Sequence, residues 1–438
     1  MKYKIVIFLT VFMTFFSVIW ASQDIKTYSK SVIAMDADSA MVLYNKNMNN
    51  KVYPASTTKI LTAILSIENL DLSKSVVVSK TALNIPWDSS SVYLKEGEVI
   101  SVKDLLYCLL LNSGNDAANV LAEAVSGDIE SFVKLMNTKL KELGCTNTNF
   151  VNAHGYSHNK HYTTALDMAK IFSYCIKNQT FVDIISSRTY TVEATNKTST
   201  KRLLKNTNRL ILQKEDSIHA RFYKYCIGGK TGYTDEAGRT LVTFAKKDNK
   251  TIIVAVFGAG SNGSQDARYT DAINLFEYSF NNFNKVTIAE AQNYIFNYIN
   301  INKKLNYTVG LKDNVEILSK SGYMPNMYYT INIDDKNLQN IDNKNINEIP
   351  VGNIAFVYDD ENGNNYNMTK PLYLMEVQKY NPIFNSNNFN IWIFVIIGFI
   401  LFIIIFVIYI CSRAKKNNKR IASSSMPSRK ANRKNKKS

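Results

Sequence analysis

Ser56 and Lys59 have the types and the spacing of a nucleophile and its base. They follow a turn signal at Pro54 and open an apolar run with helical spacing that contains Ile60, Leu61, Ile64, Leu65 and Ile67. A three-residue spacing puts both side chains on one face of a helix, at its positive end. Burial or a second nearby cation would lower the pKa of the lysine, so that its amine could take the serine proton.

The spacing of this pair does not by itself show that the two residues are catalytic. Ser56 could be only a helix N-cap, and Lys59 only an exposed residue of the first turn. The same S-x-x-K spacing occurs at Ser131/Lys134, Ser157/Lys160 and Ser412/Lys415. Ser131 and Lys134 lie in an amphipathic stretch at 128–143, which is typical of a solvated helix face.

Two further motifs follow the first in chain order. Ser113-Gly114-Asn115 stands between two apolar helical patterns, and Lys230-Thr231-Gly232 precedes a strand hairpin. The combination of S-x-x-K, S-D-N and K-T-G is the signature of active-site serine penicillin-binding proteins and class A β-lactamases. We expect a loop serine and amide to face the nucleophile from one side, and the lysine and hydroxyl of a strand to face it from the other.

The elements that must position these motifs alternate between strands and helices. Residues 32–45 predict two strands around a turn, and Ser101 caps a predicted helix with a Ser-Val-Lys-Asp pattern. Two more strands are predicted at 240–245 and 251–257, followed by a helix at 267–281. The chain is therefore predicted to contain both strands and helices.

With these motifs the sequence resembles the low-molecular-mass penicillin-binding proteins, specifically the serine-type D-alanyl-D-alanine carboxypeptidases. Gly114 stands where the motif set has Asp, as is common in this group. The resemblance implies an α/β (α+β) fold with an antiparallel sheet flanked by helices. It also implies a β-lactamase/transpeptidase-like catalytic domain at 28–282, a small β-rich domain at 286–380 and a C-terminal membrane attachment. The stretches that carry it are 42–47, 54–59, 113–118, 161–165, 206–210 and 230–234.

The resemblance also implies a role for each motif residue. Ser56 would attack the carbonyl between the last two D-alanines of a peptidoglycan stem peptide, with Lys59 as general base and Ser113 as proton relay. Lys230 would hold Ser113 and lower the pKa of Lys59. The backbone N–H groups of Ser56 and Tyr233 would form the oxyanion hole, and β-lactams would be covalent inhibitors. The substrate-binding residues would be Asn115, Lys230, Thr231, Gly232 and Tyr233, and Arg268 could add positive charge beside the terminal carboxylate.

No metal or organic cofactor is expected. Three of the four histidines, His154, His158 and His161, are close enough in sequence to suggest zinc. However, Gly155 interrupts them and the H-E-x-x-H glutamate is missing. The five cysteines are scattered and form neither a metal spacing nor an evident disulfide framework.

Both ends of the chain indicate membrane segments. Residues 1–21 have a short basic start and an apolar stretch, which is typical of a signal peptide, with an uncleaved anchor as the alternative. Residues 391–411 form an uncharged apolar run, and about 20 residues suffice to cross a bilayer. The tail at 412–438 carries eleven of the sixteen net positive charges, which by the positive-inside rule places it in the cytoplasm and the catalytic domain outside. A nucleic-acid partner is therefore not expected.

Several alternatives to the carboxypeptidase remain at this point. A class A β-lactamase would need a deacylating glutamate in an E-x-x-L-N pattern, and none of the glutamates between Asn115 and Lys230 begins one. A D,D-endopeptidase that cleaves cross-links would use the same motifs. An inactive peptidoglycan-binding scaffold would not need Ser56 and Lys59 together.

Overall fold

The computed structural model describes residues 25–262, 265–300, 305–334, 337–338, 350–379, 397–410 and 413. The predicted signal peptide and almost all of the predicted basic tail lie outside these residues. The chain forms two compact units. Among the described residues, the first unit runs to Tyr294 and includes 311–334, 337–338 and 350–372, and the second includes 295–300, 305–310, 373–379 and 397–410. The predicted domain boundaries at 28–282 and 286–380 therefore stay predictions.

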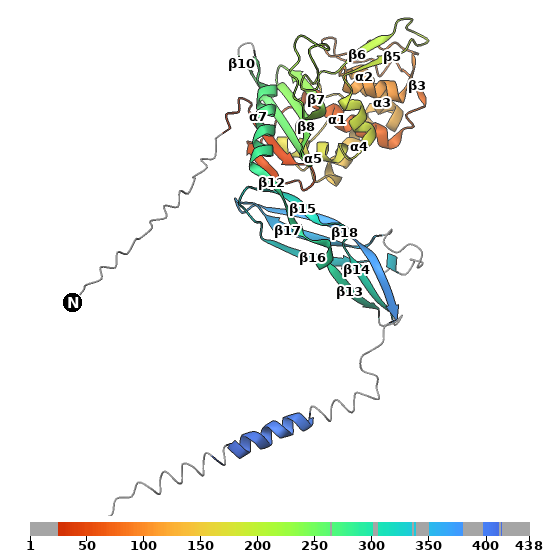
Figure 1. Cartoon of the computed structure of the whole chain (residues 1–438). Coiled ribbons are helices and arrows are strands. Elements are labelled where there is room, and N and C mark those ends of the chain that lie inside the picture. Colours follow the sequence, from red (N-terminus) through yellow and green to blue (C-terminus); the bar gives the residue numbers. More distant parts are fainter. Residues whose placement is uncertain are drawn as a thin grey trace, which may run out of the picture. The chain divides into compact units, whose positions relative to one another are not determined.

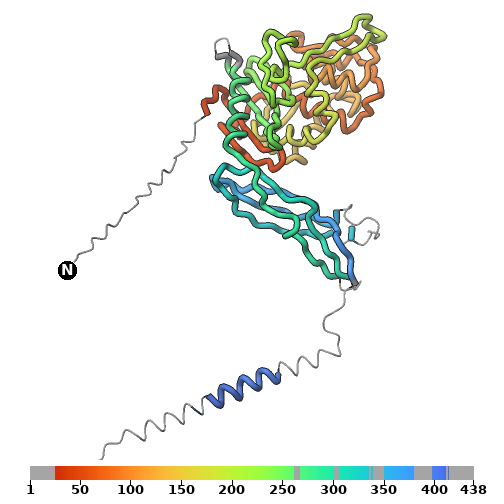
Figure 2. The backbone as a smooth tube through the Cα atoms, in the orientation of Figure 1, coloured from red at the N-terminus to blue at the C-terminus, as the bar shows by residue number. Residues whose placement is uncertain are grey.

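A five-stranded antiparallel sheet organises the first unit (Figures 1 and 2). The strands predicted at 32–45, 240–245 and 251–257 are confirmed. Every residue of the first strand is buried, because apolar residues of a central strand are covered on both faces. The strand order is β2 (Val42–Lys46), β1 (Ser31–Asp36), β9 (Lys250–Ala259), β8 (Gly238–Lys247) and β7 (Cys226–Thr234).

Helices cover both faces of this sheet (Figure 1). α7 (Ala267–Asn282) packs on one face, against β8 and β9, and α5 (Ala165–Cys175) packs on the other. α1 (Lys59–Asn69) contacts α5 and is buried over its first eight residues, so it lies inside the helical layer. The other helices of this layer are α2 (Val102–Leu110), α3 (Asn115–Ser126), α4 (Ile129–Glu142) and α6 (Gln179–Ser186).

Side-chain caps explain where two of these helices begin. The Ser101 side chain accepts a hydrogen bond from the backbone N–H of Asp104 at the start of α2, as predicted. Thr164 does the same for Asp167 at the start of α5. Two short two-stranded sheets complete this part of the unit, β3 (Ser75–Val77) with β4 (Val99–Ser101) and β5 (Thr189–Val192) with β6 (Arg202–Lys205).

The described residues between 283 and 379 are built mainly from strands, as predicted. In the first unit, β12 (Phe283–Ala289) pairs with β15 (Val315–Lys320), and β16 (Met327–Ile333) pairs with β17 (Pro350–Asp359). In the second unit, β14 (Leu305–Gly310) pairs with β13 (Ile295–Asn300) and with the end of β18 (Asn365–Lys379). The short elements η2 (Ala291–Asn293), β10 (Ser261–Asn262) and β11 (Gln265–Asp266) connect larger ones.

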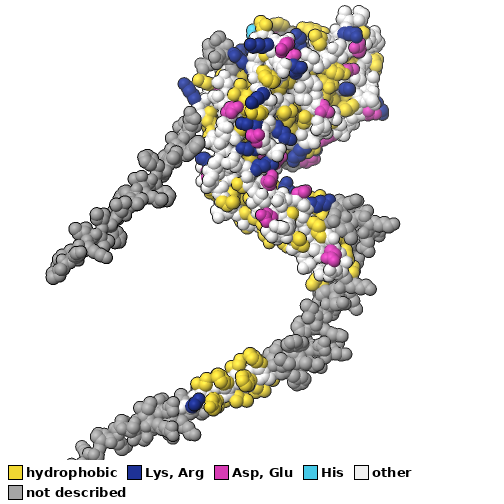
Figure 3. Space-filling view, in the orientation of Figure 1, with side chains coloured by type: hydrophobic (Ala, Val, Ile, Leu, Met, Phe, Trp, Pro, Cys, Tyr) yellow, Lys and Arg dark blue, Asp and Glu magenta, His cyan; other side chains and the backbone are white. Residues whose placement is uncertain are grey.

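Residues 397–410 are helical, and Figure 3 shows this helix covered by hydrophobic side chains. They form the described part of the predicted membrane segment at 391–411. Among the described residues, no helix has both the length and the apolar character needed to cross a membrane.

Candidate active site

A strained turn presents Ser56 at the start of the central helix. Ser56 lies in the 3₁₀ turn η1 (Ala55–Thr58), and Ala55 before it has a φ of 49°, which side-chain-bearing residues rarely adopt. The loop at Gly155, whose own φ is 88°, packs directly on this turn. A Cβ at Gly155 would lie 1.9 Å from the carbonyl oxygen of Ala55, so only glycine fits there.

Lys59 is fully buried, and its amine has three partners. Nζ lies 2.9 Å from Ser56 Oγ, 2.7 Å from Asn115 Oδ1 and 2.7 Å from the carbonyl oxygen of His154. The last two oxygens can only accept hydrogen bonds. A neutral amine has two protons and one lone pair. Its protons are therefore taken by Asn115 and His154, and its lone pair is left facing the Ser56 hydroxyl.

The surroundings of Lys59 favour this neutral state. Burial lowers the pKa of Lys59 well below its usual value, and the positive charge of Lys230 lowers it further. The carboxylate of Asp116 acts in the opposite direction. Asp116 is held by the hydroxyl of Ser91 and the backbone N–H groups of Val92 and Leu94, so it mainly pins the loop beside the site.

The contact between Asn115 and Lys59 leads to a prediction about pH. In Asn115→Asp, a carboxylate would replace the amide oxygen and stabilise the ammonium form, which would raise the pKa of Lys59. We expect the acid limb of penicillin acylation to move to higher pH by at least about one unit, with slower acylation at neutral pH. The pH dependence of the labelling rate measures this. An Asn115→Asp profile that overlays the parent profile would contradict the contact.

Ser113 and Asn115 come from the loop between α2 and α3, as expected. Ser113 has a φ of 62°, which turns the chain sharply before α3 begins at Asn115. The backbone N–H of Asn115 donates to the carbonyl of Ser90, which ties this loop to residues 88–90. Ser113 is 8% exposed and lines the cavity described below.

The third motif lies on the edge strand β7. Gly232 passes so close to the nucleophile that an added Cβ would lie 2.8 Å from the Ser56 nitrogen. Burial and the charge of Arg268 lower the pKa of Lys230 to about 7. Its ammonium donates to the carbonyl of Thr231 at 3.0 Å, and no hydrogen bond joins Lys230 to Ser113 in the part of the chain described here. The Tyr233 side chain points outward, is 58% exposed, and bonds Asp235.

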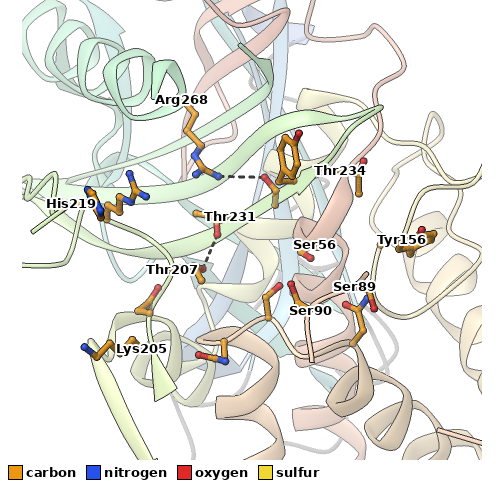
Figure 4. Close-up of a pocket in the computed structure, with 18 of the residues that line it drawn as sticks. Ser56, Ser89, Ser90, Tyr156, Lys205, Thr207, His219, Thr231, Thr234 and Arg268 are labelled. Carbon is orange, nitrogen blue, oxygen red and sulfur yellow. Dashed lines mark hydrogen bonds between the residues drawn. The ribbon is translucent and has the colours of Figure 1, made fainter. Parts of the chain in front are cut away.

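Thr207 is a site residue that the sequence motifs did not single out. Its hydroxyl accepts a hydrogen bond from Thr231 at 2.7 Å (Figure 4). Two buried asparagines hold it in place, because Asn206 bonds the carbonyls of Ile185 and Ser187 and Asn208 bonds Thr243. The sequence signal that could have identified Thr207 is its position in the 206–210 stretch, one of the stretches that carry the family resemblance.

Arg268 of α7 reaches the same end of the site, as Figure 4 shows. Its guanidinium donates to the carbonyl of Gly232 at 3.4 Å and to that of Thr240 at 3.3 Å. It also lies over the ring of Tyr269 at 4.8 Å. The Tyr269 hydroxyl in turn donates to the Thr207 carbonyl at 3.1 Å, so one buried side chain links Arg268 to the Thr207 loop.

These residues surround one open cavity of about 1060 Å³. Its walls include Ser56, Ser113, Asn115, Thr231, Gly232 and Arg268, together with residues 88–90, 155–157, 205–207, 216–219 and 233–236. Lys59 and Lys230 lie behind the walls, fully buried. A peptide placed here would meet a serine hydroxyl, a fixed amine and a group of donors at one end, which is the arrangement for acyl transfer to serine.

Two histidines near the site make structural contacts. His161 lies 2.8 Å from the Thr58 hydroxyl through Nε2, and its Nδ1 accepts from the Val151 N–H. Burial lowers the pKa of both His154 and His161 to about 3, so both are neutral. Within the described residues, no group of three or more His, Cys, Asp or Glu side chains could hold a metal ion.

Comparisons with known proteins agree with this geometry. The family profile described as D-alanyl-D-alanine carboxypeptidase matches residues 18–261. The carboxypeptidase DacF of Bacillus subtilis is 37% identical over 282 residues, which cover 62% of this chain and 68% of that protein. The structure of penicillin-binding protein 5 from Haemophilus influenzae aligns with a TM-score of 0.60 and 26% identity, over 81% of this chain and 98% of its own.

A D-alanyl-D-alanine carboxypeptidase structure from Mycobacterium tuberculosis aligns with a TM-score of 0.53 and 30% identity, over 59% of this chain and 92% of its own. Fold and site together define a serine hydrolase with the mixed α/β fold of penicillin-binding proteins. Within that class, the chain belongs to the D-alanyl-D-alanine carboxypeptidase family. Enzymes of this family work through an acyl-enzyme on serine.

Proposed function

We propose that this protein removes the terminal D-alanine from peptidoglycan stem peptides through an acyl-enzyme on Ser56. One observation carries the assignment of roles. The buried Lys59 amine lies 2.7 Å from two carbonyl oxygens and 2.9 Å from Ser56 Oγ, so that in its neutral form its lone pair faces that hydroxyl. A solvated N-cap with a surface lysine would have neither the burial nor these partners.

The reaction then follows in two stages. The Ser56 oxygen bonds to the carbonyl carbon of the penultimate D-alanine while its proton passes to Lys59. The N–H groups of Ser56 and Tyr233 stabilise the oxyanion, an interaction worth ~3–4 kcal/mol per donor in related sites. The C–N bond breaks, D-alanine leaves with a proton relayed through Ser113, and water hydrolyses the ester. The Asn115 side chain, fixed by Lys59, binds the peptide backbone.

The substrate's terminal carboxylate binds at the other end of the cavity. Thr231 and Thr207 offer two hydroxyl groups whose oxygens are 2.7 Å apart, and Arg268 adds a positive charge beside them. Lys230, which is fully buried, precedes Thr231 on β7. Because Thr231 donates its proton to Thr207 in this structure, the Thr207 hydroxyl is the one that donates to a carboxylate oxygen, beside the positive charge of Arg268.

Thr207→Val tests the second hydroxyl of this carboxylate site. The change keeps the shape of the side chain and removes one hydrogen bond to a charged group. We expect KM for a D-Ala-D-Ala tripeptide to rise about tenfold, the effect of ~1.4 kcal/mol, with kcat little changed. Ser157→Ala is the matched control, because Ser157 and Thr234 form a hydroxyl pair at 2.8 Å elsewhere on the cavity wall. Equal KM values for Thr207→Val and the parent enzyme would remove Thr207 from the carboxylate site.

The decisive experiment combines turnover with covalent labelling. The full-length chain in detergent is incubated with diacetyl-lysyl-D-alanyl-D-alanine, and released D-alanine is assayed with and without prior treatment with penicillin. We expect release that penicillin blocks, and a penicillin adduct on the proteolytic fragment that contains Ser56. If neither release nor labelling occurs, the chain is a binding scaffold on this fold. Labelling without release would favour the D,D-endopeptidase, which a cross-linked muropeptide substrate tests.

We also propose an extracytoplasmic location for the catalytic unit. The support is the composition of the chain ends, with a signal-like start at 1–21, an apolar run at 391–411 and a basic tail at 412–438. Protease treatment of intact cells that carry epitope tags at residue 30 and at the C-terminus tests it. Cleavage of the catalytic unit with protection of the C-terminal tag is expected, and protection of both tags would contradict this location.

A further inference from the structure

Large apolar side chains are exposed on two loops beside the catalytic cavity. Among the described residues, the three most exposed large hydrophobic side chains are Trp87 at 96%, Ile218 at 92% and Tyr93 at 82%. All three belong to the first unit. A single exposed apolar residue needs no explanation, but such a concentration beside a substrate cavity indicates an interaction surface. We call these three residues the apolar rim.

The two loops of the apolar rim border the cavity from different sides. Trp87 directly precedes the cavity-lining residues 88–90, and Ile218 lines the cavity itself next to His219. Figure 4 shows Ser89 and His219 on opposite sides of Ser56. The loops of Trp87 and Ile218 therefore border the cavity on opposite sides of Ser56.

The exposure of Trp87 does not come from a loose loop. Its turn is closed by Ser89, whose backbone N–H and hydroxyl both bond the Pro86 carbonyl, at 3.0 and 2.6 Å. The Tyr156 hydroxyl bonds Asp88 at 3.2 Å. Trp87 is thus held in water on a fixed turn, which spares a ligand the cost of ordering it.

The loop of Ile218 is also tied at its base. Asp216 forms an ion pair with Arg188 at 3.0 Å, and the Arg221 N–H donates to the carbonyl of Arg209 at 2.9 Å. Tyr93 has a φ of 56°, which is rare for a bulky residue and costs conformational energy. Both loops therefore present their apolar side chains from defined positions.

We propose that the apolar rim binds the glycan strand to which the stem peptide is attached. This inference rests on the proposed function. A short stem peptide extends by at most ~3.5 Å per residue, so the sugar at its far end lies near the mouth of the cavity while its D-alanine end is bound at Ser56. The C–H faces of pyranose rings stack on indole and phenol rings.

The first test measures binding without turnover. The full-length Ser56→Ala chain in detergent is sedimented with purified insoluble peptidoglycan. The same measurement is made on a chain that carries Trp87→Ala and Ile218→Ala in addition to Ser56→Ala. We expect the rim substitutions to weaken binding about tenfold. Val77→Ala, which changes a 66% exposed residue of β3 outside the cavity, is the matched control and should bind like Ser56→Ala itself.

The second test compares substrates with an intact Ser56. In the Trp87→Ala/Tyr93→Ala chain, whose two substituted residues do not line the cavity, kcat/KM should fall about tenfold on polymeric peptidoglycan with D-Ala-D-Ala stems and stay within about twofold on the tripeptide. Equal losses on both substrates, or no loss on the polymer, would overturn the inference. The inference would also be overturned if the rim substitutions weakened binding to anionic phospholipid vesicles and left binding to peptidoglycan unchanged. Failure of the proposed function would be distinguishable, because the parent chain would then neither turn over the tripeptide nor be labelled by penicillin.

Discussion

Ser56→Ala is expected to abolish both D-alanine release and covalent penicillin labelling, a loss of at least about 10⁴-fold in kcat/KM. The reason is that the acyl group has no other acceptor in the cavity with a base beside it. Ser113 shares the cavity, but the amine of Lys59 is aimed at Ser56 Oγ by its bonds to Asn115 and His154. Turnover of the tripeptide and fluorescent penicillin labelling measure the two losses.

Ser131→Ala provides the control for this prediction. Ser131 has the same spacing to Lys134 as Ser56 has to Lys59, but Lys134 lies on the surface and pairs with Glu130 at 2.9 Å. Ser131 itself bonds the N-cap Asp128 of α4. Its substitution should leave both readouts unchanged. Residual labelling of Ser56→Ala at another serine would show that Ser56 is not the acylated residue.

Lys59→Met is expected to slow penicillin acylation by about 10³-fold, because it removes the group that takes the serine proton. The pH dependence should change as well. The folded-state pKa of Lys59 is lowered, so its amine is neutral above that pKa and becomes protonated as pH falls through it. Acylation of the parent enzyme should therefore decline on the acid side, and this acid limb should be absent in Lys59→Met. Stopped labelling reactions across pH measure both effects.

The Lys59 variant must be shown to be folded. Methionine removes a buried amine but leaves the Asn115 and His154 carbonyls without their donor, so the thermal unfolding midpoint is measured beside activity. Lys134→Met is the surface control. A folded Lys59→Met enzyme that keeps the parent rate and its acid limb would assign the base to another group.

The sequence by itself determined the motifs, their order and most of the elements that carry them. Alternating apolar patterns predicted β1, β2, β8 and β9, and the 3.6-residue period together with the Ser101 cap predicted α2. These signals are local, because helix and strand periods and caps depend on neighbours within a few residues. The family resemblance was likewise readable, since it depends on short stretches around Ser56, Ser113 and Lys230.

Only the tertiary structure decided which S-x-x-K pair has a buried lysine. Ser56/Lys59 and Ser131/Lys134 have the same spacing. Their lysines differ in surroundings, because Asn115 and His154, far away in sequence, surround the Lys59 amine, whereas the Lys134 amine lies on the surface. Thr207 and Arg268 joined the site for the same reason, because β7, α7 and the 206–210 stretch meet only after folding. Burial and long-range hydrogen bonds set the pKa of Lys59, and no local pattern encodes them.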